Sequence, residues 1–206
     1  MRALILVDIQ NDFLPGGALP VPDGDAVVPV ANRLQELFPV VVATQDWHPA
    51  NHGSFAANHP GKKVSEEIEL NGLSQTLWPV HCVQNTLGAE FAPGLKRESI
   101  QQVFQKGVDP LIDSYSGFFD NAHRRSTGLG DWLKERNVTE VYVCGVATEY
   151  CVNFTALDAL SLGFRSCLVE DASRGVNVRA GDVDRAIIKM KAEGVVITRS
   201  DQIVRI

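Results

Sequence analysis

The sequence predicts an α/β fold with three layers, α/β/α, in which a mostly parallel central sheet lies between two layers of helices. Short apolar runs alternate with helical patterns along most of the chain, several of these runs are apolar on both faces, and polar residues follow them directly. Strands that are apolar on both faces belong to parallel sheets covered by helices on both sides. The chain has 206 residues, of which 45% are hydrophobic, so we expect one domain over residues 1–206.

The first half of the chain contains three predicted strands and a helix. The strands cover Ala3–Val7, Val40–Ala43 and, as a weaker run, Val103–Phe104. They end at Asp8, near Asp46 and at Lys106–Gly107. Asp25 is the expected cap of a helix between the first two strands. The apolar residues of that helix recur at three-residue spacing, at Val28, Ala31, Leu34 and Leu37.

In the second half of the chain, predicted strands and helices alternate more clearly. Strands are predicted at Val141–Cys144, at Arg165–Val169, which ends at Glu170–Asp171, and at Val195–Thr198. Helices are predicted around Trp132–Leu133, stopping near Asn137, at Cys151–Leu162, ended by Gly163, and at Ala180–Glu193, stopped by Gly194. In the first half, after the strand at Val40–Ala43, Pro49–Arg97 is rich in Gly, Asn, His and Pro, and a loop insertion of this length is usually functional or disordered.

Composition excludes several partners. A net charge of −6 without any run of Lys or Arg disfavours binding to nucleic acid or to an anionic membrane. No segment has the length of a membrane span or the apolar core of a signal peptide. The four cysteines form no Cys-x-x-Cys pair and no secreted-type framework, which indicates a reducing, cytoplasmic location. Association into a homo-oligomer is left open.

The reactive residues follow predicted strands. Asp8, Asp46, Lys106 and the turn before Cys151 each come at a strand end, and a parallel sheet gathers its carboxyl ends on one edge, where ligands bind. Taken alone, Asp8 is equally well explained as a cap, and Lys106 as a structural lysine. A carboxylate directly after a buried strand is nevertheless costly unless it is paired or used.

Cys151 is the candidate nucleophile. It is expected to open a helix, where the dipole and free N–H groups stabilise a thiolate, whereas Cys144 and Cys167 lie within apolar strands and fit inert core cysteines. Histidine is the usual base for such a thiol. None is near Cys151 in sequence, so either a distant histidine approaches it in space or Asp8 serves as base with Lys106 as the cation.

A metal site is the second prediction. Asp46 and His48, two residues apart on an extended segment, project to the same side, and His52, His59 and His81 follow in the insertion. Carboxylate and imidazole ligands suit zinc, iron or manganese. The alternative is that these are ordinary surface-loop histidines, but the spacing favours the metal.

Six motifs in order resemble the nicotinamidase/pyrazinamidase branch of the isochorismatase-like cysteine hydrolases, whose fold is Rossmann-like, over essentially the full chain. They are Asp8–Phe13, Gln45–Pro49, Trp78–Cys82, Lys106–Gly107, Asp113–Ser116 and Gly145–Val152. The resemblance implies a cytoplasmic enzyme of NAD salvage that converts nicotinamide to nicotinate and ammonia through a cysteine thioester, and that also accepts pyrazinamide. It thus implies a small-molecule substrate.

The resemblance also implies roles for individual residues. Asp8, Lys106 and Cys151 would form the catalytic triad. One divalent metal ion (zinc, iron or manganese) would be held by Asp46, His48 and His81. A fourth protein ligand of some relatives falls at Ser54, with His52 two residues before it.

The remaining implied features surround the carboxamide and the ring. A cis peptide between Val146 and Ala147 would let the N–H groups of Ala147 and Cys151 form an oxyanion hole. Phe13, Trp78 and Tyr115 would bind the pyridine ring, although core packing also explains these aromatics, Phe13 above all.

Three other functions are weighed. An amide or ureido hydrolase of the same superfamily would share the triad, but relatives that act on open-chain substrates generally lack the metal ligands. An isochorismatase-type vinyl-ether hydrolase would not need Cys151. A non-catalytic binding protein would not be expected to keep every reactive position.

Overall fold

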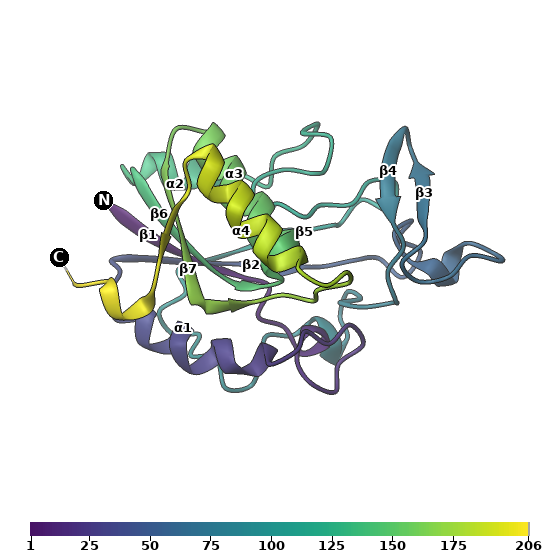
Figure 1. The fold of residues 1–206 in the computed structure, drawn as a ribbon, viewed down its shortest axis with the longest axis horizontal. Coiled ribbons are helices and arrows are strands. Elements are labelled where there is room, and N and C mark those ends of the chain that lie inside the picture. Colours follow the sequence, from purple (N-terminus) through teal and green to yellow (C-terminus); the bar gives the residue numbers. More distant parts are fainter. Residues whose placement is uncertain (206) are drawn as a thin grey trace.

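The computed structural model describes residues 1–205 and has a six-stranded, fully parallel sheet at its centre (Figure 1). The strand order is β5-β2-β1-β6-β7-β8. The strands cover Arg2–Val7 (β1), Val40–Asp46 (β2), Gln102–Lys106 (β5), Glu140–Val146 (β6), Arg165–Arg174 (β7) and Val196–Thr198 (β8). This arrangement confirms the three-layer α/β fold with a mostly parallel sheet.

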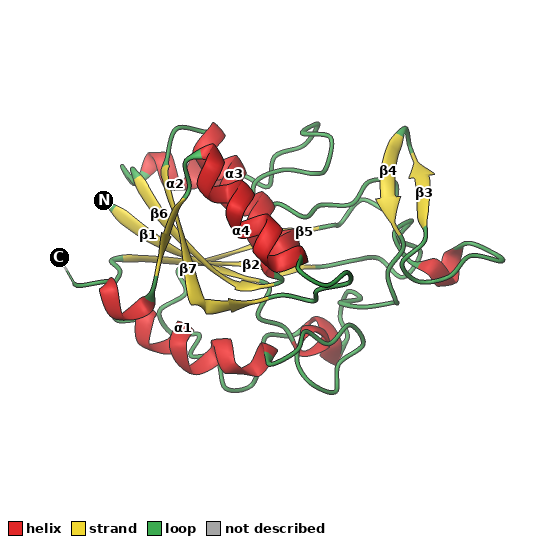
Figure 2. Cartoon of the chain, in the orientation of Figure 1, coloured by secondary structure: helices red, strands yellow, loops and turns green. Residues whose placement is uncertain are grey.

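Four α-helices cover the sheet, and Figure 2 shows α1 on one face and the other three on the opposite face. They span Val27–Gln35 (α1), Leu129–Glu135 (α2), Asn153–Ser161 (α3) and Asp182–Glu193 (α4). Asp25 does not cap α1, which corrects the prediction. It lies in a short 3₁₀ turn, and the N-cap is Ala26, whose side chain makes no capping hydrogen bond. None of the helices in residues 1–205 has the length and apolar character that a membrane crossing requires.

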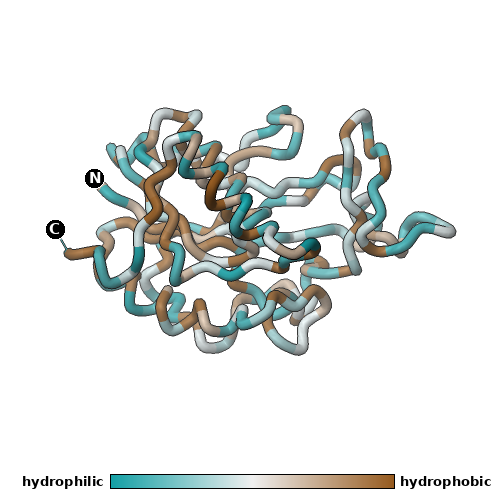
Figure 3. Tube along the Cα trace, viewed as in Figure 1, coloured by the Kyte–Doolittle hydropathy of each residue, from teal (hydrophilic) through white to brown (hydrophobic). Residues whose placement is uncertain are grey.

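Each central strand contributes to two apolar cores because its side chains alternate between faces. In β1, Leu4 and Leu6 pack under α1, whereas Ala3, Ile5 and Val7 pack under the other helices. Figure 3 shows the hydrophobic segments gathered in the strands. Burying a side chain such as Leu stabilises the fold by about 1.5–3 kcal/mol.

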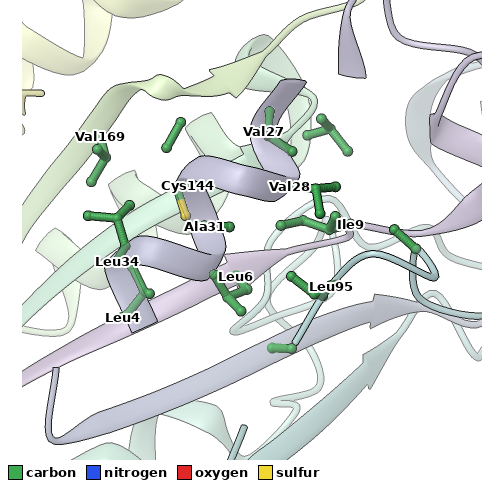
Figure 4. Packing of buried hydrophobic residues seen from close by; sticks show 14 of the residues in the cluster. Leu4, Leu6, Ile9, Val27, Val28, Ala31, Leu34, Leu95, Cys144 and Val169 are labelled. Atoms are coloured by element: carbon green, nitrogen blue, oxygen red, sulfur yellow. The ribbon is translucent and has the colours of Figure 1, made fainter. Parts of the chain in front are cut away.

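The apolar residues at three-residue spacing in the first helix are the ones that pack against the sheet. Figure 4 shows Val28, Ala31 and Leu34 of α1 facing Leu4 and Leu6 of β1. Ala31 and Leu34 are almost fully buried. Leu37, the last residue of the predicted pattern, lies beyond the end of α1 but still packs against the same core.

Most of the insertion 49–97 lies beyond the carboxyl ends of the strands (Figure 1), and its last residues return along α1, where Leu95 joins the core. It contains an antiparallel hairpin formed by β3 (Glu67–Leu70) and β4 (Leu73–Thr76). Short 3₁₀ turns and irregular backbone make up most of the rest. The insertion therefore stands next to the edge of the sheet at which ligands bind in folds of this type.

Candidate active site

The strand order changes direction beside β1, and this creates the site. From β1 the chain moves to β2 and β5 on one side, and then returns to β6 on the other side of β1. Ligands of open parallel sheets bind at the carboxyl ends of strands flanking such a switch point. Asp8 follows β1, and the turn that carries Cys151 follows β6, so both lie at that edge.

Asp8, Lys106 and Cys151 are brought together there. Lys106 Nζ lies 2.9 Å from Asp8 Oδ2 and 3.4 Å from Cys151 Sγ. A carboxylate oxygen of Asp8 and the sulfur of Cys151 lie within 4.8 Å of each other. Thr44 donates to Asp8 Oδ1 at 2.6 Å, which fixes the carboxylate. All of these side chains are buried, and the polar groups beside the thiol are Lys106 and the carboxylates of Asp8 and Asp46 rather than a histidine.

Burial controls the protonation of this cluster. It raises the pKa of the Cys151 thiol well above its ordinary value, although Lys106 acts in the opposite direction. It also raises the pKa of Asp8, against the lowering effect of Lys106. Burial would lower the pKa of Lys106, but Asp46 and Asp8 raise it well above the ordinary value. The resting cluster thus holds a neutral thiol, a charged lysine and a carboxyl close enough to take the proton of the thiol.

The turn around Cys151 differs from the predicted one. Cys151 does not open a helix: it is the fourth residue of a π-helical turn, Thr148–Val152, that runs directly into α3. A single π turn is often found at functional sites. The peptide bond between Val146 and Ala147 is cis, as the resemblance implies. Ala147 and Cys151 face the same pocket.

Asp46, His48 and His81 form the second cluster, and their donor atoms all lie within 4.8 Å of one another. His48 Nε2 is 3.4 Å and His81 Nε2 is 3.8 Å from Asp46 Oδ2. The Nδ1 atoms of the two rings lie 2.9 Å from the Gly107 carbonyl and 2.8 Å from the Pro79 carbonyl. Carbonyls only accept hydrogen bonds, so each Nδ1 carries a proton and each Nε2 is the atom that faces Asp46. Burial lowers the pKa of His48, but Asp46 raises it above its ordinary value, so its Nε2 would give up a proton when a cation binds. This donor set fits a divalent metal ion.

The charges of this cluster are consistent with a cation site. Burial would raise the pKa of Asp46, but Lys106 and His48 lower it, so the carboxylate is ionised. Burial and the neighbouring His48 lower the pKa of His81 to about 4, so this ring is neutral near pH 7. A neutral imidazole and an ionised carboxylate are the forms that bind metals.

The side chains of His52 and Ser54 are hydrogen-bonded to each other. His52 Nδ1 lies 2.7 Å from Ser54 Oγ, and both side chains are fully buried. His52 belongs to a second group with His48 and Asp113, and not to the group of Asp46, His48 and His81. His59 lies apart from both groups, with its Nε2 2.7 Å from the Gly53 carbonyl.

Two neighbours hold the metal-binding cluster in place. Gln10 accepts the N–H of Asp46 at 2.8 Å and donates to the Asp46 carbonyl at 2.8 Å, so one amide clamps this residue. Gly107 has a φ of +64°, and a Cβ there would lie 2.3 Å from Cε1 of His48. Only glycine lets the His48 ring approach this backbone so closely.

Both clusters open into one pocket. It is lined by Phe13, Leu19, Asp46, His48, Trp78, His81, Asp113, Tyr115, Ala147, Tyr150, Cys151 and Val176. The three predicted aromatics, Phe13, Trp78 and Tyr115, are all among them. Trp78 Nε1 donates to the Tyr115 hydroxyl at 3.2 Å, and its ring meets Tyr150 edge-on.

Four lining residues were absent from the sequence prediction: Leu19, Asp113, Tyr150 and Val176. Asp113 and Tyr150 lie inside motifs of the resemblance, so their motifs pointed to the site without assigning them a role. Leu19 and Val176 come from loops without any distinguishing pattern. Only the folded chain places them at the pocket.

The fold and the site define a member of a known family. The isochorismatase domain family matches residues 2–202, and the chain belongs to this family. It is 53% identical to a nicotinamidase of Escherichia coli (strain K12) over 197 residues, covering 94% of this chain and 92% of the relative.

Two solved structures share the fold at substantial identity. A nicotinamidase/pyrazinamidase of Acinetobacter baumanii is 48% identical, has a TM-score of 0.95 and covers 98% of both chains. A pyrazinamidase of Pyrococcus horikoshii, solved in complex with zinc, is 42% identical with a TM-score of 0.78. The match covers 96% of this chain and 98% of that one.

Proposed function

We propose that this chain is a nicotinamide amidohydrolase, which converts nicotinamide to nicotinate and ammonia and also accepts pyrazinamide. The substrate is a small molecule. One observation carries the proposal: a single pocket is lined by the Cys151 thiol, which lies beside Asp8, and also by the Asp46, His48 and His81 donor set. The identity of 53% to a nicotinamidase over nearly the whole chain supports the same activity.

The first step is acyl transfer to Cys151. Its sulfur attacks the carboxamide carbon while Asp8 takes the thiol proton, so a neutral thiol with a carboxyl partner is a suitable resting state. The N–H groups of Ala147 and Cys151 stabilise the oxyanion, and one such donor contributes roughly 2.7–4 kcal/mol. As the C–N bond breaks, Asp8 gives the proton to the departing amine, and ammonia and a thioester result.

The second step is hydrolysis. Asp8, again a carboxylate, takes a proton from a water molecule that attacks the thioester carbon, and the C–S bond breaks to return the thiol and release the acid. Lys106 keeps Asp8 oriented and balances its charge through the 2.9 Å ion pair. Phe13, Trp78 and Tyr115 hold the ring of the substrate.

The metal is proposed as zinc, iron or manganese, bound by Asp46, His48 and His81. When bound, such an ion supplies a Lewis acid that can hold the pyridine nitrogen and so orient the ring. The zinc-bound pyrazinamidase of P. horikoshii supports a divalent ion in this fold.

The test is ammonia release from nicotinamide and from pyrazinamide by the purified protein, with the bound metal quantified on the same sample. We expect turnover of both amides and about one metal ion per chain. Folded, metal-loaded protein that releases no ammonia from nicotinamide would refute the proposal.

Location and assembly are further proposals. The four cysteines are all free, which supports a reducing compartment such as the cytoplasm. Association into a homo-oligomer is tested by analytical ultracentrifugation of the purified protein.

A further inference from the structure

The segment Gly175–Val178, between β7 and α4, forms one wall of the pocket. Val176 faces the pocket beside Ala147 and Cys151. Asn177 has a φ of +52°, and its side chain accepts the N–H of Val183 at 3.2 Å, where α4 begins. The position of Val176 therefore depends on what holds this short irregular segment.

Glu149 contacts this segment from the opposite side of the pocket wall. It lies in the π turn, two residues before Cys151, and is only 9% exposed. Its Oε1 accepts the N–H of Asn177 at 2.6 Å. A Cβ at Gly175 would lie 2.4 Å from its Oε2, so the backbone of the segment lies directly against the carboxyl group.

The charge of Glu149 has no cationic partner. Within residues 1–205 no Lys, Arg or His nitrogen lies within 4.0 Å of it, and its Oε2 has no hydrogen-bond partner. Burial raises the pKa of this carboxyl, although backbone N–H groups lower it. A buried carboxyl is costly unless it is hydrogen-bonded, and the hydrogen bond that the segment provides here is the one from the N–H of Asn177.

We propose that Glu149 is a positioning residue that fastens the segment Gly175–Val178 to the turn carrying Cys151, and so holds Val176 against the bound substrate. The inference rests on the amidase activity proposed above. Glu149 acts here as a hydrogen-bond acceptor. The neutral amide oxygen of Gln at this position should therefore serve as well as the carboxylate. Movement of the segment would loosen binding of the ring more than it would alter the thiol.

The test compares Glu149→Ala with Glu149→Gln. For Glu149→Ala we expect KM for nicotinamide to rise about tenfold, and kcat and the rate of Cys151 alkylation to change less than threefold. Hydrogen exchange of the peptide that contains Asn177 should become at least tenfold faster. Glu149→Gln should restore both KM and exchange to within about twofold of the wild type.

Two further variants make the outcome decisive. Asp158→Ala removes a carboxylate of similar burial, 8% exposed, on the neighbouring α3 and should leave KM and this exchange unchanged. Gly175→Ala keeps Glu149 but drives a methyl group against Val183 of α4 (2.2 Å) and into the Glu149 carboxyl (2.4 Å). It displaces the segment from both contacts, and should reproduce the higher KM and faster exchange even if Glu149→Ala fails to fold. Unchanged KM and exchange in Glu149→Ala, or an equally damaged Glu149→Gln, would overturn the proposal. An inactive wild type would instead refute the proposed function, because the exchange measurement does not depend on turnover.

Discussion

Asp46 and Lys106 are register partners in the final rung of the β2–β5 ladder, and their side chains form an ion pair of 2.5 Å. Asp46 uses its other oxygen, Oδ2, to face the two histidines. Lys106 also contacts Asp8 and Cys151. A single carboxylate therefore couples the metal-binding cluster to the catalytic cluster, and a change in one alters the electrostatics of the other.

Cys151→Ala should reduce turnover by on the order of 10⁴-fold or more, because the acyl group then has no nucleophile. Metal content and circular dichroism should match those of the wild type. Cys144→Ala is the matched control, since this buried cysteine lies in β6 away from the pocket lining. Substantial nicotinamide hydrolysis by Cys151→Ala would argue against covalent catalysis.

Asp8→Asn should separate proton transfer from thiol ionisation. We expect kcat to fall by about 10²–10⁴-fold, because the base is lost. The Asp8 carboxylate raises the pKa of the Cys151 thiol, so its removal should lower that pKa, and alkylation at pH 7 should not slow down. Parallel losses of kcat and alkylation would show that Asp8 acts mainly by maintaining a thiolate.

The pH dependence of alkylation reports the resting state of the thiol in the wild type. Because burial raises the pKa of Cys151 well above 9.0, the thiol is protonated at neutral pH. The rate of reaction with iodoacetamide should therefore still be rising as the pH passes 9. A plateau reached below pH 7 would instead reveal a thiolate stabilised before substrate binds.

Gly107→Ala tests the support of the metal-binding cluster. The new methyl group would meet the His48 ring and should weaken metal binding by roughly 10–100-fold, measured by competition with a chelating dye. Gly128→Ala is the control. Gly128 also has a positive φ, +89°, but nothing lies within 4 Å of a Cβ there. Both substitutions therefore strain the backbone, but only Gly107→Ala also creates a clash with a side chain. Equal metal affinity in both variants would contradict the role of Gly107.

Metal removal should leave a folded protein with little or no activity, which zinc, iron or manganese restores. The two apolar cores lie on the faces of the sheet and do not depend on Asp46, His48 or His81. Benzamide lacks the ring nitrogen and should be a poor substrate of the loaded enzyme. Equal hydrolysis of benzamide and nicotinamide would exclude an orienting role, and loss of the circular dichroism signal on chelation would make the metal structural.

The sequence predicted the parallel strands well because their two faces are both buried. In β2, every residue from Val40 to Asp46 is buried, so an apolar run that ends in a charged residue marks both the strand and the edge where ligands bind. The hairpin β3–β4 lacked such a signal. Its side chains are mostly exposed or partly buried, and each strand has only four residues. Charged and apolar residues alternate in β3, and β4 has one apolar residue followed by three polar ones.

The π turn and part of the pocket were beyond sequence reasoning for a different reason. Both a π turn and an α-helix bury Cys151 and Val152, so apolar spacing alone does not distinguish them. Leu19 and Val176 reach the pocket through loop conformations set by tertiary contacts, such as the bond from Asn177 to Glu149. Such contacts cannot be inferred from the amino-acid composition of the loops themselves.

The central place of β1 also sets the order in which the protein can fold. Ala3 pairs on one side with Val40 and on the other with Val141, which is synthesised much later. At about 5–20 residues per second, a ribosome needs roughly 7–28 s to make the chain between Ala3 and Val141. During that time one edge of β1 and its apolar side chains stay without their final neighbour, which makes the nascent chain prone to aggregation. Cys151 and the second strand partner of β1 are therefore synthesised almost together, late in the chain.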